Sequence, residues 1–265
     1  MMLGTCTKSF GGMSVAETAE IFEVSGLDYA ELCFCQKELN GWKYNLCGYE
    51  PLPFSSEVAA AMDIFRSHGV SICALGVYNC LWQGSSSDCV DSLRIFREYC
   101  DIAFENGIAI LATHTGTVLN TANARKSAPD IRKKVFDSFT MALTEAAKCG
   151  LTVAVECSPF DILTNYSDFC ELKEHIQRTL GTSSMLKYIA VPSSDDRNVD
   201  ISDIALYHLK DKKRGGMFYE RFGEGDADFS DFFADICKAS DIPVILEHVN
   251  SGNLSETARR VREKM

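Results

Sequence analysis

The most constraining feature of this sequence is an alternation of short apolar runs with longer segments of helical period. The runs lie at residues 2–7, 28–34, 70–78, 108–114, 151–157, 186–191, 204–210 and 243–249. Each has the length of a strand. Nearly continuous apolar strands are typical of a parallel sheet that is covered by helices on its faces. The pattern therefore predicts an α/β protein with eight parallel strands.

Helical segments follow most of these runs. We expect helices at residues 15–26, 55–69, 88–107, 130–149, 168–180, 229–238 and 254–264. Ser14 is a suitable N-cap for the first of them. The stretch from 192 to 203 is too short for a full helix. Eight strand units in 265 residues favour a closed (β/α)8 TIM barrel, whose usual size is about 250 residues. Because no Gly/Pro/Ser-rich linker interrupts the chain, we expect residues 1–265 to form a single domain.

Composition narrows the classes of partner and the cellular compartment. The chain has 26 Lys and Arg against 37 Asp and Glu, a formal net charge of −11, which argues against binding nucleic acid. It contains neither an apolar run long enough to span a membrane nor a secretory signal. Most of its 12 cysteines lie in apolar runs. We therefore expect a cytoplasmic protein whose cysteines are all free thiols.

Several polar residues stand where the predicted strands end, and in a barrel those ends meet at one mouth. They are Glu31, His114, Glu156, His208, Lys210 and Glu247. A carboxylate buried without a partner costs several kcal/mol or becomes protonated. Two explanations stay open: Glu156 and Glu247 bind a divalent cation together with His208, or each pairs with a nearby Lys or Arg. His248 should face the other side of its strand from Glu247.

The motifs around these residues resemble a known family. They are VAVEC at Glu156, YHLKD at 207–211, GEGDADFSDFF at 223–233 and ILEHV at Glu247. Together they are similar to the xylose isomerase-like barrels, the group of sugar phosphate isomerases and epimerases. The resemblance implies that Glu156, His208 and Glu247 are metal ligands, and that His114 and Arg214 contact the substrate. We also expect Glu31 to line the pocket or to pair with a barrel lysine, and Lys210 to hold a substrate oxygen. Asp211 should orient Lys210 or His208, or be a solvated loop carboxylate.

One position departs from the family pattern. The family ends its sixth strand with an Asp that is followed closely by a His or Asn. Here Val191 stands in place of that Asp, and Ser194 in place of the His. Asp195 or Asp196 would have to reach back from the loop to supply the missing ligand, so a metal at this site is in doubt.

The resemblance implies a metal-dependent sugar or sugar phosphate isomerase or epimerase. Mn, Mg, Co or Zn would stabilise an enediolate while Glu156 and Glu247 transfer protons as the catalytic pair. One alternative is a lyase of the inosose dehydratase type. Another is a barrel with a degenerate metal site that only binds a ligand. An abasic-site endonuclease is disfavoured by the 5 His and the negative charge. We expect a small sugar substrate; homo-oligomer formation is left open.

Overall fold

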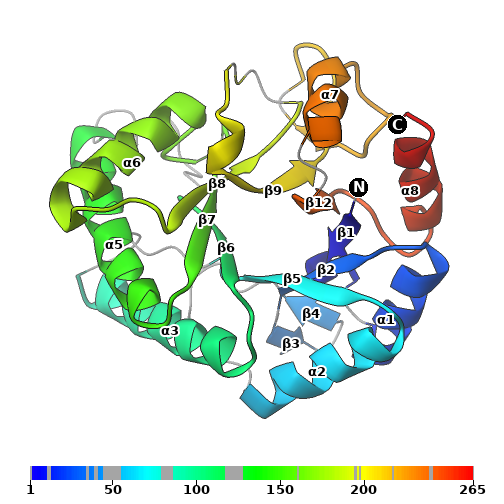
Figure 1. The fold of residues 1–265 in the computed structure, drawn as a ribbon, viewed down its shortest axis with the longest axis horizontal. Helices are drawn as coiled ribbons and strands as arrows, with labels where there is room; N and C mark the ends of the chain where they lie inside the picture. Colours follow the sequence, from blue (N-terminus) through cyan, green and yellow to red (C-terminus); the bar gives the residue numbers. More distant parts are fainter. Residues whose placement is uncertain are drawn as a thin grey trace.

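The structure is a computed structural model that describes most of the chain. The described residues are 2–10, 13–33, 36–38, 41–43, 55–78, 86–116, 128–159, 161–193, 196, 198–216, 218–238 and 241–264. They form a closed barrel of eight parallel strands that is surrounded by helices (Figure 1). The TIM-barrel prediction is therefore confirmed.

The barrel strands coincide with the eight apolar runs of the sequence. They are β1 (Leu3–Cys6), β2 (Tyr29–Cys33), β5 (Ser71–Gly76), β6 (Ile110–His114), β7 (Thr152–Glu156), β8 (Leu186–Ala190), β9 (Ile204–Leu209) and β12 (Val244–Leu246). Their order around the barrel is β1-β12-β9-β8-β7-β6-β5-β2. The barrel closes where β1 pairs with β12, with Leu3 opposite Val244.

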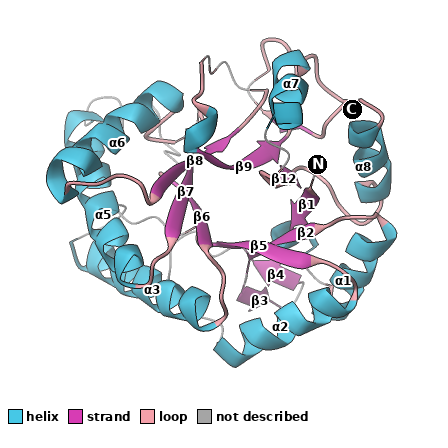
Figure 2. Cartoon of the chain, in the orientation of Figure 1, coloured by secondary structure: helices cyan, strands magenta, loops and turns pink. Residues whose placement is uncertain are grey.

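The helices form the outer ring of the molecule (Figure 2). They are α1 (Val15–Val24), α2 (Ser55–Ser67), α3 (Ser86–Glu105), α5 (Ala128–Lys148), α6 (Tyr166–Leu180), α7 (Ser230–Lys238) and α8 (Leu254–Arg262), with the short 3-10 helices η1 (Thr7–Phe10) and η2 (Ile201–Asp203). Ser14 caps α1 as predicted, in a capping box with Glu17. Between β8 and β9, the described residues contain only the single turn η2, so this connection lacks a full helix, as its length predicted.

The barrel interior is filled mainly by small and branched side chains. Ala74, Ala112, Ala154, Ile189 and Leu206 form a buried cluster there with Tyr78. A larger apolar cluster lies between the strands and the helices. Residues that alternate along one strand thus serve two cores, which explains why the strands read as continuous apolar runs.

Two hairpins extend beyond the strand ends. β3 (Gln36–Glu38) pairs with β4 (Gly41–Lys43), and β10 (Asp211–Lys212) pairs with β11 (Tyr219–Glu220). Asp211 is buried and accepts hydrogen bonds from the backbone N–H groups of Gly223 and Ala227. It therefore organises the segment after β11, which corrects both expectations for its role.

Two further features bear on the composition arguments. No described helix is both long and apolar enough to cross a membrane. The cysteines whose sulfur atoms the structure describes are free thiols.

Candidate active site

Three strand ends bring Glu156, His208 and Glu247 together at one mouth of the barrel. Glu156 ends β7, His208 is the fifth residue of β9, and Glu247 directly follows β12. One ligand atom from each lies within 4.8 Å of the other two. All three residues are buried. The spatial convergence expected from the barrel topology is therefore present.

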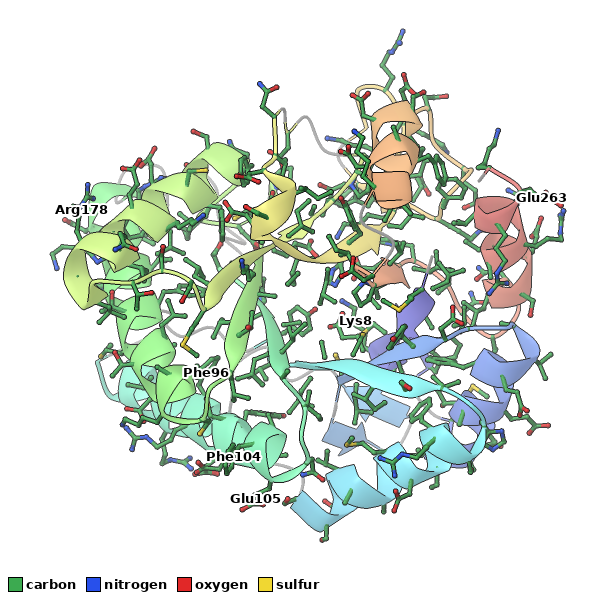
Figure 3. All side chains as sticks on the ribbon, in the orientation of Figure 1. Lys8, Phe96, Phe104, Glu105, Arg178 and Glu263 are labelled. Atoms are coloured by element: carbon green, nitrogen blue, oxygen red, sulfur yellow. The ribbon has the colours of Figure 1, made fainter. Side chains whose placement is uncertain are left out.

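An ammonium group joins the two carboxylates. Nζ of Lys210 lies 2.6 Å from Oε1 of Glu156 and 2.6 Å from Oε2 of Glu247. A second lysine, Lys8, follows β1 and places its Nζ 2.9 Å from the other oxygen of Glu247. Figure 3 shows Lys8 inside the ring of strands, whereas Arg178 and Glu263 lie on the periphery. The ion pairs that the sequence offered as the alternative to a metal are therefore formed.

His208 connects the cluster of Glu156, Lys210 and Glu247 to Glu31 in the barrel interior. Its Nδ1 lies 2.6 Å from Oε2 of Glu156, and its Nε2 lies 2.9 Å from Oε2 of Glu31. Because both ring nitrogens face carboxylate oxygens, both carry protons and the ring is an imidazolium. Burial would lower the pKa of His208, but the surrounding carboxylates, Glu247 and Glu31 foremost, raise it to about 10.

The two carboxylates on the cavity wall are ionised. Burial alone would raise their pKa values. The Lys210 ammonium outweighs that effect and lowers the pKa of Glu156 to about 2. Lys210, Lys8 and His208 together hold the pKa of Glu247 well below its ordinary value. Three carboxylates therefore face three cations, so the charges of this buried cluster balance. The cluster consists of Glu31, Glu156, Glu247, Lys8, Lys210 and His208.

Glu31 lies behind His208 and does not line the cavity. Its side chain has no exposed surface, and Oε1 accepts a 2.5 Å hydrogen bond from the hydroxyl of Tyr78. In this structure Glu31 therefore positions His208 and does not face the space where a substrate would bind.

Glu156, Lys210 and Glu247 lie on the wall of a cavity of about 350 Å³. Its lining residues are Lys8, Ser9, Tyr78, His114, Glu156, Ser158, Asp161, Lys210, Glu247 and His248. This volume is at the lower end of the usual range for small-molecule sites. Every one of these residues carries a polar group, which suits a ligand rich in hydroxyl groups.

His114 offers this cavity a hydrogen-bond donor. The backbone N–H of Gly116 donates to its Nδ1 at 3.1 Å, so the proton of the neutral ring resides on Nε2. Among the described residues, that buried Nε2 has no hydrogen-bond partner. A buried donor without a partner is costly, and the adjacent cavity has room for a molecule that accepts this hydrogen bond.

The other predicted residues lie away from the cavity. Arg214 is exposed in the turn after β10 and is not on the wall; its substrate contact stays a prediction. Val191 follows β8 and is buried. Asp196 accepts hydrogen bonds from the Tyr166 N–H at 2.9 Å and from the Tyr188 hydroxyl at 2.6 Å, so it joins α6 to β8 and does not supply a fourth ligand. Ser194 and Asp195 lie outside the described residues.

Sequence reasoning missed several wall residues, among them Lys8, Tyr78, Asp161 and His248. His248 was expected on the far side of its strand from Glu247. It lines the cavity because β12 ends at Leu246 and because His248 has a φ of 57°, which breaks the alternation of a strand. Lys8 and Tyr78 each stand two residues after the end of a strand, β1 and β5 respectively, and that position was the one signal available for them.

Comparison with known proteins places this barrel in a class. The model of the xylose isomerase-like TIM barrel family matches residues 23–265. The chain belongs to that family, as the motifs implied. No curated protein sequence matches the chain.

Solved structures of low sequence identity share the fold. The IolI protein with a bound zinc atom has a TM-score of 0.71 at 14% identity, over 100% of this chain and 97% of that one. The 3-keto-D-glucoside 4-epimerase YcjR from E. coli has a TM-score of 0.72 at 14% identity, over 99% of both chains. D-Psicose 3-epimerase from Clostridium cellulolyticum H10 has a TM-score of 0.68 at 9% identity, over 100% of this chain and 98% of that one.

Proposed function

We propose that this protein is an isomerase or epimerase of a sugar or a related polyol. The observation that carries the proposal is Lys210, which bridges two ionised carboxylates on the wall of a polar cavity. Membership of the xylose isomerase-like family supports it. The names of two structural neighbours, a 3-keto-D-glucoside 4-epimerase and a D-psicose 3-epimerase, point to the same kind of reaction.

The reaction moves a proton on a carbon beside a carbonyl group. A carboxylate, Glu156 or Glu247, removes that proton. The Lys210 ammonium, which contacts both groups, passes a proton to the other carboxylate, and this carboxyl group then delivers it on the opposite face or at the neighbouring carbon. The first carboxyl group returns its proton to Lys210, which restores the starting state. The ammonium groups of Lys210 and Lys8 stabilise the oxyanion of the enediolate. The N–H of His114 holds a further substrate oxygen. A substrate oxygen that takes a hydrogen bond from Lys210 also frees a carboxylate to act as a stronger base.

The divalent ion that the sequence predicts does not fit this donor set as it stands. Both oxygens of Glu156 and of Glu247 already accept from Lys210, Lys8 or His208. Both nitrogens of His208 are bonded to carboxylates. No step of the proposed reaction therefore passes through a metal.

Proton exchange in D2O tests the proposed activity. Ketoses and keto-glycosides, free and phosphorylated, would be incubated with the protein and followed by proton NMR. Deuterium should enter at the carbon beside the carbonyl as the epimer or isomer accumulates. Glu156→Gln and Glu247→Gln should each lower kcat by about 10²–10⁴-fold, whereas the exposed Glu20→Gln serves as the matched control and should leave kcat unchanged.

The same measurement separates the alternatives. A product that has lost water, with an inosose as substrate, would replace the proposal with the lyase. Saturable binding of a sugar without exchange in any arm would favour a barrel that only binds its ligand.

A further inference from the structure

We infer that Lys210 is a built-in cation of this barrel, occupying the position between Glu156 and Glu247 that would otherwise admit a metal ion. This deepens the proposed function, because it assigns the positive charge of the site to the protein itself. Only one part of the inference rests on the proposed function, namely that the charge of Lys210 takes part in a reaction. The occupancy of the position by Lys210 is a separate claim and is tested separately.

The geometry places the Lys210 ammonium where a shared cation would lie. Its Nζ contacts one oxygen from each carboxylate at 2.6 Å. The same two carboxylates belong to the triad of Glu156, His208 and Glu247, whose ligand atoms lie within 4.8 Å of one another. The second oxygen of each carboxylate is already held by His208 or Lys8, so a divalent ion bound to both carboxylates would have to displace a partner from each of them. Lys210 is the partner that both carboxylates share.

The charges around that position disfavour such an exchange. Lys8 lies 2.9 Å from Glu247, and Nδ1 of His208 lies 2.6 Å from Glu156. The ammonium groups of Lys8 and Lys210 thus already bring two positive charges to Glu156 and Glu247. A divalent ion that displaced Lys210 would still lie within a few ångströms of Lys8, in a buried region where repulsion is strong.

The number of ligands points the same way. Val191, the residue that follows β8, is apolar and offers no ligand atom. Asp196 is committed to Tyr166 and Tyr188. Three ligands remain among the described residues, one fewer than the family pattern implies. The substitution after β8 and the lysine after β9 therefore act together: Val191 removes a ligand, and Lys210 supplies a cation to the two carboxylates.

Removing the ammonium group should reveal the metal site. Lys210→Met keeps most of the aliphatic stem and deletes the charge, which leaves two carboxylates without their shared partner. We expect this variant to bind one equivalent of Co²⁺ or Zn²⁺. The wild-type protein should bind no equivalent at the triad under the same conditions.

The experiment compares wild type, Lys210→Met, Lys8→Met, Glu247→Gln and the double variant Lys210→Met/Glu247→Gln. Lys8→Met is the matched control, because it deletes a cation on Glu247 but leaves the Lys210 bridge intact. Each protein would be stripped with chelator and titrated with Co²⁺ by visible absorption and calorimetry. The thermal midpoint would be recorded with and without Zn²⁺, which reports binding even if Lys210→Met is less stable.

The inference is supported if only Lys210→Met acquires the Co²⁺ absorption bands and a Zn²⁺-dependent rise in its thermal midpoint. The double variant should lose both. One equivalent of metal in wild type that Glu247→Gln abolishes would overturn the inference. So would a folded Lys210→Met variant that neither binds Co²⁺ nor rises in midpoint with Zn²⁺. Failure of the proposed function looks different: the metal results hold, but no sugar in the panel exchanges a proton.

Discussion

Nε2 of His208 lies 2.9 Å from Oε2 of Glu31, and neither side chain has any exposed surface. Because the other nitrogen of the same ring contacts Glu156, this contact connects the buried Glu31 to a carboxylate that lines the cavity. A buried pair of this kind is costly to break when only one partner is removed.

Glu31→Gln should therefore lower the free energy of unfolding by about 3 kcal/mol. The amide keeps the shape of the side chain but removes the charge that faces the imidazolium. Urea denaturation followed by circular dichroism measures the change, with the exposed Glu20→Gln as control. A loss below about 0.5 kcal/mol, the usual range for surface changes, would mean that the His208–Glu31 pair is not charged.

His114→Phe separates substrate binding from stability. The ring loses its acceptor bond from Gly116 but also its buried, unpartnered Nε2 donor. We expect the free energy of unfolding to change by less than about 1.5 kcal/mol. The value of kcat/KM for a turned-over sugar should fall at least about tenfold, since a buried hydrogen bond to substrate is lost. Unchanged kcat/KM would remove His114 from the substrate site.

Gly225→Ala should disrupt the segment that Asp211 organises. A Cβ at this glycine would lie 2.3 Å from Oδ1 of Asp211 and 2.6 Å from the backbone nitrogen of Lys212. Relieving that overlap should cost about 1–3 kcal/mol and lower the thermal midpoint. Gly252→Ala is the control, because its nearest neighbour is 3.3 Å away, at Oδ1 of Asn250. Equal midpoints for the two variants would contradict the role assigned to Asp211.

Asp168 ties α6 to α5 and should make stability depend on pH in the acid range. Burial would raise its pKa, but the Thr164 N–H and the Arg132 guanidinium lower it overall. A carboxyl with a lowered folded-state pKa stabilises the protein above its unfolded pKa of about 3.9, and that contribution is lost as pH falls through the folded value.

Asp168→Asn should accordingly cost about 1 kcal/mol at pH 7 and less below about pH 4. Unfolding curves at several pH values measure this trend. Asp63→Asn, in an exposed ion pair with Arg66 on α2, should show little effect at any pH. A cost for Asp168→Asn that is independent of pH would show that charge is not its source.

The hydrophobic pattern of the sequence was sufficient to predict the barrel fold. Eight apolar runs predict eight strands because each strand is buried on both faces, and the strand-end rule then brings Glu156, His208 and Glu247 to one mouth. The same rule cannot tell whether a cation between them is a metal ion or a lysine. That depends on where the flexible side chain of Lys210 folds back, which spacing does not encode.

The wall residues that were missed share a different cause. Lys8 belongs to the turn η1, and His248 takes a left-handed conformation after β12, so neither follows the alternation of a strand. Asp196 stands close enough in sequence to replace the missing ligand, yet its hydrogen bonds with Tyr166 and Tyr188 hold it on the helix side of β8. Competing partners of this kind become visible only in three dimensions.

The pairing of β1 with β12 has a consequence for how the chain folds as it is synthesised. Thr5 of β1 donates to the carbonyl of Leu246, across a sequence separation of 241 residues. One edge of β1 therefore has no strand partner until β12 has left the ribosome, and β9 waits for the same strand. Since unpaired strand edges are templates for aggregation, a nascent or truncated chain lacking β12 should depend on chaperones far more than the closed barrel does.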